Sequence, residues 1–223
     1  MHIRAKLLSF IVAGIMFMPL LRLSAGINGD IYVAGVSKYL WRGQILYSGF
    51  AVQPGADLNY NNFSIGFWGS FCTKEAKFGE ADFLAGYSTS ISIFNLGAGY
   101  TFYTFPNAAS TSHEAYINAE VNIFLSPSLI LYYDFADGDG AYMEGGLSIP
   151  FTVGLEFTFA PTLGLNLGQW GYKSSFSVLG LGLSTTIAFG DNIDITPLLF
   201  YQIALNKQYN SDGFASLTVQ YNF

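Results

Sequence analysis

The sequence predicts an all-β fold, specifically a transmembrane antiparallel β-barrel of about 12 strands. Three observations lead to this prediction. The chain starts with a short apolar run of the export type. Its composition is 51% hydrophobic and 17% aromatic, yet no further apolar stretch reaches the length of a spanning helix, and its apolar residues recur with period two. Inside a bilayer only helices and closed barrels satisfy every backbone hydrogen-bonding group, so a closed barrel is the expected fold.

Residues 1–25 are predicted to be a cleaved signal peptide, and residues 26–223 the barrel. Two cationic residues precede the apolar run from Leu7 to Leu21, and small residues surround Ala25, after which we expect cleavage. The alternative is a membrane anchor. It is disfavoured because the run is shorter than the ~20 residues that a spanning helix needs, and because Pro19 interrupts it.

Export would leave a strongly acidic chain. Without residues 1–25, 6 Lys and Arg remain against 15 Asp and Glu, which gives a net charge near −9. Such a chain is poorly suited to bind nucleic acid, so no nucleic-acid partner is expected. Cys72 is the single cysteine and has no partner for an internal disulfide. The sequence has no metal-ligand cluster and no cofactor motif, so neither a metal nor a cofactor is expected.

The period-two alternation divides the chain into strands. In "SLTVQYNF" (216–223), apolar residues occupy every second position, and "FSIGFWGSF" (63–71) is similar. The predicted strands are residues 30–42, 49–60, 62–71, 80–89, 92–103, 113–124, 128–136, 141–149, 153–167, 175–189, 192–204 and 213–223. Pro54, Pro161 and Pro197 fall inside these strands, where a closed barrel offers no free edge, so bulges are expected to accommodate them.

The connections between the predicted strands alternate in length. Tight turns are predicted at residues 61–62, 90–91, 126–127, 150–152 and 190–192. Longer polar links are predicted at residues 43–48, 72–79, 104–112, 137–140, 168–174 and 205–212. An even number of strands with short turns on one side and longer loops on the other is typical of the outer membrane. We therefore expect the barrel to lie in outer-membrane lipid, with the short turns and both termini facing the periplasm.

Aromatic residues flank the connections on both sides, as the interfacial belts of an outer-membrane barrel do. The residues predicted to face lipid at the two interfaces are Tyr39, Trp41, Tyr60, Phe63 and Phe223. The stretch "VSKYLWRGQ" (36–44) also contains two cations. If the first strand runs to residue 42, alternation points Tyr39 and Trp41 to lipid, and Lys38 and Arg42 into the lumen.

The same alternation, applied to every strand, predicts the charged lining of the lumen. The predicted channel-lining residues are Lys38, Arg42, Glu120, Glu144 and Glu156, with the three glutamates near mid-height. The predicted outer mouth contains Glu80, Asp82, Glu114 and Asp134. A buried ion without a partner costs several kcal/mol, so the mid-height glutamates are protonated or meet water. Many inward positions are glycine, which either leaves space in a narrow hydrated lumen or serves the curvature of the wall.

A series of motifs in the first half of the exported chain resembles a known family. The motifs are "SKYLWRG" (37–43), "AVQPGADLNY" (51–60), "FSIGFWGS" (63–70), "EADFLAGY" (80–87), "LGAGYTFYTFP" (96–106) and "HEAYINAEV" (113–121). In this order they resemble the Gcw-chp family of conserved hypothetical proteobacterial outer-membrane proteins. After residue 129 only "LYYD" (131–134) fits. The resemblance implies an exported barrel and supplies no substrate and no site residues.

Two classes of function fit these predictions. One is a narrow channel for small solutes with a preference for cations. The other is a structural or scaffolding barrel that binds a protein partner through its loops or turns. An enzyme is not expected, and no catalytic residue is assigned, because alternation puts His113 and Glu114 on opposite sides of the wall. The cost of unpaired carboxylates in the lumen favours the hydrated channel.

Overall fold

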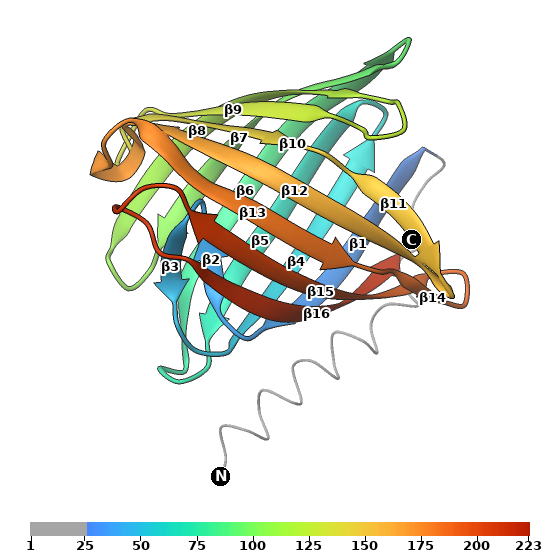
Figure 1. The fold of residues 1–223 in the computed structure, drawn as a ribbon. Coiled ribbons are helices and arrows are strands. Elements are labelled where there is room, and N and C mark those ends of the chain that lie inside the picture. Colours follow the sequence, from blue (N-terminus) through green and yellow to red (C-terminus); the bar gives the residue numbers. More distant parts are fainter. Residues whose placement is uncertain (1–25) are drawn as a thin grey trace.

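The computed structural model describes residues 26–223, so the predicted signal peptide lies outside the described residues. The described chain forms a closed antiparallel β-barrel of 12 strands, as the sequence predicts (Figure 1). In chain order, the wall contains β1 (Ile27–Val36), β4 (Ala51–Tyr60), β5 (Phe63–Cys72), β6 (Lys77–Ile91), β7 (Phe94–Phe105), β8 (Ser110–Val121), β9 (Ser128–Asp134), β10 (Gly140–Gly146), β11 (Ile149–Val153), β12 (Leu155–Leu167), β13 (Ser175–Ser184), β14 (Ile187–Phe189), β15 (Ile193–Ala204) and β16 (Asp212–Asn222). β10 and β11 together form one interrupted wall strand, and so do β13 and β14. Two further strands, β2 (Tyr39–Trp41) and β3 (Gln44–Tyr47), and the short 3₁₀ helix η2 (Gln169–Gly171) belong to the loops.

Strands that follow one another along the wall pair with one another, and the ring closes where β1 pairs with β16. At this seam, Ile31 lies opposite Tyr221 and Val36 lies opposite Ser216. The wall therefore presents no open edge, as lipid requires. We call the end that holds the 61–62 turn and residue Phe223 the turn end. The opposite end, which holds residues 37–50, 168–174 and 205–211, is called the loop end.

Two wall strands are interrupted opposite a proline. β10 and β11 both pair with β12, and the residues between them lie opposite Pro161, which has no N–H to donate. β13 and β14 are likewise separated opposite Pro197 of β15. The pairing register is the same on both sides of each interruption, and it also continues past Pro54. The prediction of bulges at these prolines was wrong at Pro54 and Pro197, and the register shift near Pro161 lies between Leu163 and Leu165.

The connections differ less in length than predicted. The long hairpins formed by β6, β7 and β8 extend further than the sequence pattern indicated, which leaves only residues 73–76 and 106–109 as loops between β5 and β6 and between β7 and β8. The turn predicted at residues 150–152 is part of β11, and the chain reverses instead at Gly154, whose φ is 71°. Gly154 adopts this left-handed conformation without a Cβ penalty.

The first predicted strand, 30–42, ends earlier than expected because the chain turns back on itself. β1 stops at Val36, and β2 and β3 form a separate hairpin at the loop end (Figure 1). The tip of this hairpin is Arg42-Gly43, whose φ angles are 47° and 87°. Positive φ at both central residues is the signature of the type I′ turn that closes two-residue hairpins. We call residues 37–50 the mouth hairpin.

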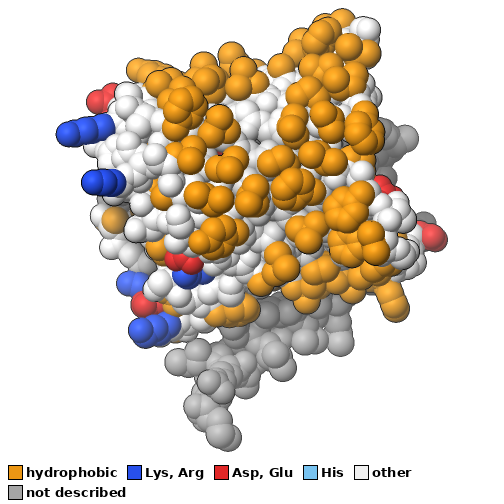
Figure 2. All heavy atoms as spheres, in the orientation of Figure 1, with side chains coloured by type: hydrophobic (Ala, Val, Ile, Leu, Met, Phe, Trp, Pro, Cys, Tyr) orange, Lys and Arg blue, Asp and Glu red, His pale blue; other side chains and the backbone are white. Residues whose placement is uncertain are grey.

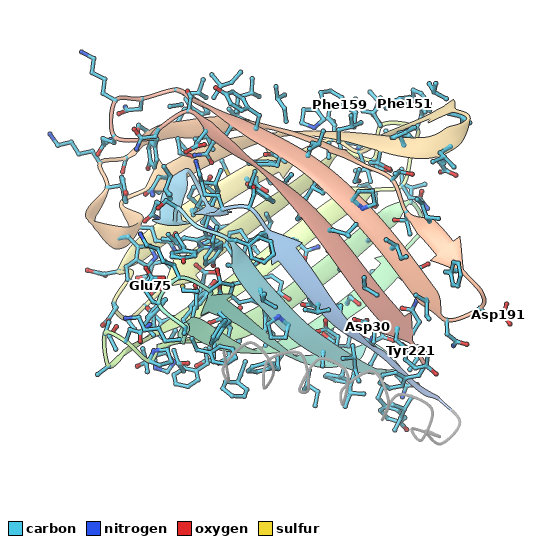
Figure 3. All side chains as sticks on the ribbon, turned by 90° about the horizontal axis from the view of Figure 1, so that it is seen from below. Asp30, Glu75, Phe151, Phe159, Asp191 and Tyr221 are labelled. Carbon is cyan, nitrogen blue, oxygen red and sulfur yellow. The ribbon has the colours of Figure 1, made fainter. Side chains whose placement is uncertain are left out.

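The outer surface is apolar over the height of the wall. Outward side chains such as Ile65 and Leu199, each 61% exposed, would be unfavourable in water and suit a hydrocarbon environment. Hydrophobic side chains cover the face in Figure 2, and Lys and Arg side chains on that face gather toward the loop end. Figure 3 places Phe151 and Phe159 on the outside of the wall, with Glu75 and Asp191 at opposite ends.

Three of the predicted interfacial aromatics lie on this outer surface at the turn end. Tyr60 and Phe63 flank the 61–62 turn and are 56% and 62% exposed. The ring of Phe223 lies beside Gly29, and the backbone groups of these two residues exchange hydrogen bonds. Within residues 26–223, no helix has the length and apolar character needed to cross a membrane.

Candidate functional site

The mouth hairpin carries Arg42 into the interior of the barrel, where its charge is fully engaged. Nη1 and Nη2 of Arg42 donate to the two carboxylate oxygens of Glu114 on β8, at 2.5 and 2.8 Å. Nη1 also donates to Oε1 of Gln169 at 2.9 Å, and Gln169 donates back to Glu114 at 2.7 Å. The hydroxyl of Tyr103 on β7 completes the set by donating to Glu114 at 2.8 Å. This bidentate pair fastens the hairpin tip to the far wall.

Aromatic rings surround the Arg42 guanidinium. Its Cζ atom lies 3.7 Å from the ring centroid of Tyr132, 4.4 Å from that of Trp41 and 5.0 Å from that of Tyr142. Burial alone would lower the pKa of Arg42, but the hydrogen bonds and charge of Glu114 outweigh it and raise that pKa above its ordinary value. Arg42 therefore remains a cation beside the Glu114 carboxylate.

The second inward cation is also paired. Nζ of Lys38 lies 2.6 Å from Asp212, the first residue of β16, at the rim of the loop end. Within residues 26–223, the ion pairs are Lys38–Asp212 and Arg42–Glu114. Each cation thus neutralises one carboxylate, and the other inward carboxylates have no cationic partner.

Two of these carboxylates lie side by side on the inner face of β6. Glu80 and Asp82 are each 5% exposed. The Tyr39 hydroxyl donates to Oε2 of Glu80 at 2.9 Å. Oδ1 of Asp82 is buried without a hydrogen-bond partner among the described residues. A buried polar atom of this kind costs free energy unless something outside the described chain meets it.

Asp134, the fourth residue of the predicted outer mouth, accepts hydrogen bonds from neighbouring protein groups. Its fully buried carboxylate accepts from the Ser112 hydroxyl at 2.7 Å and from the backbone N–H groups of Ala136 and Gly138 at 2.9 and 3.1 Å. It therefore stabilises the short loop that follows β9.

A cavity of about 570 Å³ lies directly beneath the mouth hairpin. Tyr39, Trp41 and Arg42 of the hairpin line one side of it. The wall strands β5 to β9 line the rest, with residues that lie progressively nearer the turn end, such as Leu84, Asn118 and Ile130. The cavity is the part of the lumen that the mouth hairpin covers.

Several inward glycines lie against tyrosine side chains of the neighbouring strands. A Cβ at Gly55, Gly99 or Gly164 would come within 2.4 Å of a tyrosine ring or hydroxyl on the neighbouring strand. The tyrosines concerned are Tyr32, Tyr116 and Tyr142, respectively. These glycines therefore accommodate side chains that lie flat along the wall and do not leave open space.

The structure corrects two of the interfacial assignments. Tyr39 and Trp41 were predicted to face lipid, but both line the cavity, and Trp41 packs against Tyr103 and Trp170. The reason is the mouth hairpin: once the chain leaves the wall after Val36, alternation along the wall no longer decides where its side chains point.

The three predicted mid-height glutamates lie at different levels. Glu120 precedes the last residue of β8, and Glu156 follows the first residue of β12, so both lie near the turn end, and Glu156 is exposed. Glu144 lies deeper, opposite Ile130 and Gly164 on the adjacent strands. The prediction of mid-height was therefore wrong for Glu120 and Glu156, because strand tilt and unequal strand lengths separate sequence position from depth.

Several residues of this site were not predicted from the sequence. Gln169 comes from the loop that contains η2, where no periodicity indicates a direction. Tyr103 and Tyr132 could have been found, because they occupy the inward register of β7 and β9 beside Glu114 and Asp134. The signal is that the hydroxyl groups of both tyrosines point inward, beside an arginine that also points inward.

No protein-family model matches the chain, and no curated protein matches it. Among solved structures, it is similar to "KdgM porin", with 12% identity over 87% of this chain and 99% of that chain and a TM-score of 0.60. It is also similar to "KdgM porin in complex with disordered oligogalacturonate" (12% identity, 88% and 99% covered, TM-score 0.57). A third is the NanC porin in a rhombohedral crystal form (10% identity, 86% and 98% covered, TM-score 0.57). The fold is thus that of outer-membrane porins.

Proposed function

We propose that this protein is an outer-membrane channel for small solutes that prefers cations, narrowed at its loop end by the mouth hairpin. The observation that carries the proposal is the charge balance of the interior. Both inward cations are paired, whereas Glu80, Asp82 and Glu144 have no cationic partner among the described residues. A lumen with unpaired carboxylates attracts cations and repels anions.

The apolar outer surface and the porin-like fold support placement in the outer membrane. The similarity in fold does not identify the solute of this protein. The KdgM structure holds oligogalacturonate, a polyanion, and the unpaired carboxylates of this lumen would repel such a molecule. The series of motifs between residues 37 and 121 supports our proposal that the chain belongs to the Gcw-chp family. We also propose that residues 1–25 are a cleaved signal peptide.

A channel fits the geometry better than an enzyme. His113 lies on the outer face, where its ring packs against those of Tyr100, Phe102 and Phe135. Glu114 faces inward, and both of its carboxylate oxygens accept hydrogen bonds from Arg42. The two residues therefore cannot act together on a bound molecule, and we propose no catalytic role for either.

The selectivity of the channel provides the test. In a planar bilayer with a salt gradient, the wild-type barrel is expected to give a reversal potential of cation-selective sign. Replacing these three carboxylates together (Glu80→Gln, Asp82→Asn and Glu144→Gln) should move that potential toward zero, because it makes three acidic groups of the lumen neutral. Glu75→Gln, in an exposed loop, is the control and should leave the potential unchanged.

An anion-selective wild type would contradict the preference. A wild type without any conductance would favour the second candidate, a scaffolding barrel. The observation favouring that candidate is the bidentate Arg42–Glu114 pair, which fastens the mouth hairpin across the lumen.

The orientation of the barrel is tested separately. We expect an epitope inserted within residues 205–211 or 106–109 to be accessible on intact cells, and one inserted at residues 61–62 to be accessible only after permeabilisation. The reason is that outer-membrane barrels place short turns and termini in the periplasm. Antibody labelling of intact and permeabilised cells gives the answer, and labelling of intact cells at residues 61–62 alone would reverse the orientation.

A further inference from the structure

The cavity beneath the mouth hairpin combines two properties. Its walls are rich in aromatic rings, and its lining includes a buried carboxylate oxygen without a hydrogen-bond partner. The rings belong to Tyr39, Trp41, Trp68, Tyr103, Tyr116 and Tyr132. The carboxylate is that of Asp82, which is 5% exposed and whose Oδ1 atom has no partner among the described residues.

Within residues 26–223, no Lys or Arg side chain forms an ion pair with Asp82. Arg42 also lines the cavity, but its guanidinium is bound by both oxygens of Glu114 and by Gln169. Lys38 is bound to Asp212 at the rim. Glu80, two residues before Asp82 on the same face of β6, brings no positive charge to it. An ionised carboxylate in this position costs several kcal/mol unless a cation from outside the chain reaches it.

The surroundings of Asp82 select the kind of cation. Within residues 26–223, no group of three or more His, Cys, Asp or Glu side chains is placed to hold a metal ion. The faces of tryptophan and tyrosine attract cations, and aromatic cages recognise quaternary ammonium groups in this way. A weakly hydrated organic ammonium ion loses little on entering an aromatic cavity, whereas a small metal ion would lose its water without gaining enough oxygen ligands. The volume of about 570 Å³ lies within the range of small-molecule sites, ~300–1,000 Å³.

We propose that the cavity binds a small organic ammonium ion, with Asp82 as its counter-charge and the rings of Trp41, Trp68 and Tyr103 among its walls. This inference rests on the proposed channel and names the class of solute that the channel recognises. The ammonium group lies near Oδ1 of Asp82, and its alkyl substituents contact the rings. The mouth hairpin supplies the side of the cavity nearest the loop end, so the site exists only while Arg42 holds the hairpin in place.

Binding of choline to the refolded barrel in detergent micelles tests the proposal. The matched ligand is 3,3-dimethylbutan-1-ol, which has the shape of choline with a neutral carbon in place of the charged nitrogen. Titration calorimetry is expected to show choline binding at least ten-fold more tightly than the neutral alcohol. Asp82→Asn should lower the choline affinity at least ten-fold, whereas Asp191→Asn, the same exchange in an exposed turn at the other end, should not change it.

Folding of each variant is checked by its heat-dependent shift in gel mobility. If Asp82→Asn does not fold, Trp68→Leu takes its place. It removes one ring of the cavity, and the proposal expects it to weaken choline binding more than binding of the neutral alcohol. Equal affinity for both ligands, or unchanged choline binding by Asp82→Asn, overturns the proposal. So does binding of glucose but not choline, because aromatic walls also stack on neutral sugars.

The outcomes for the site and for the channel are distinguishable. A barrel that conducts cations but does not bind choline retains the proposed function and loses this inference. A barrel that binds choline in an Asp82-dependent manner but conducts no ions retains the site and loses the channel.

Discussion

Replacing the mouth hairpin by a short glycine-serine linker is expected to raise single-channel conductance several-fold. The hairpin places Trp41 and Arg42 across the lumen, where they cover the cavity of about 570 Å³. The wall should survive the deletion, because Val36 at the end of β1 pairs directly with Ala51 at the start of β4, so a short linker can join them. Glu114→Gln is combined with the deletion, since Glu114 would otherwise be left as an unpaired buried charge.

The control for this deletion is the same linker in place of residues 106–109, which join β7 to β8 at the same end. This exchange should leave conductance near the wild-type value. If the hairpin deletion folds and gives unchanged conductance, the hairpin does not obstruct the path of the ions and its proposed role in narrowing the mouth fails.

Glu114→Ala is expected to destabilise the barrel by roughly 3–5 kcal/mol, because it leaves the Arg42 guanidinium buried without its partner. It also removes the acceptor of the hydrogen bonds from Tyr103 and Gln169. The measurement is the free energy of unfolding by urea in lipid vesicles. The double variant Arg42→Met with Glu114→Leu should recover most of the loss, since apolar residues of similar volume often replace a buried ion pair without a penalty.

The second ion pair of the chain supplies the matched control. Lys38 and Asp212 are each 24% exposed, so Asp212→Ala should cost only about 0–1 kcal/mol. Equal losses in Glu114→Ala and Asp212→Ala would mean that Arg42 finds water or another acceptor when Glu114 is removed, and that the hairpin tip is less tightly fastened than the distances indicate.

The wall could be predicted from the sequence because lipid on one side and a polar interior on the other impose strict alternation. Each predicted strand corresponds to one wall strand, and the inward positions of Glu80, Asp82 and Glu114 follow from it. Alternation also explains the largest error. The alternation of β1 can be extended through "VSKYLWR" (36–42) without a break such as proline, so the sequence does not distinguish a continuing wall strand from an inserted hairpin. Arg42-Gly43 was the available signal, as a tip that takes positive φ at both residues.

The sequence pattern predicts neither the depth of a side chain in the barrel nor its bonding partner. Alternation assigns a side to Glu120, Glu144 and Glu156 but not a height, because height depends on the tilt of each strand and on its register with its neighbours. Alternation predicts Glu80, Asp82, Glu114 and Asp134 at the outer mouth, and only the path of the mouth hairpin selects Glu114 as the partner of Arg42. Asp134 is a further example, because the sequence pattern does not show that backbone N–H groups of the following loop donate to its carboxylate.

The seam between β1 and β16 has a consequence for how the molecule is made. Every other pair of neighbouring wall strands joins segments that are close in sequence and can form from a local turn, but Asp30 pairs with Asn222 across almost the whole described chain. Bringing such distant segments together carries the largest loss of chain entropy, so this ladder should form last. Until it forms, β1 and β16 each expose a row of unpaired backbone groups, which hydrocarbon does not tolerate. We therefore expect insertion of the strands into the bilayer to be coupled to closure of the ring.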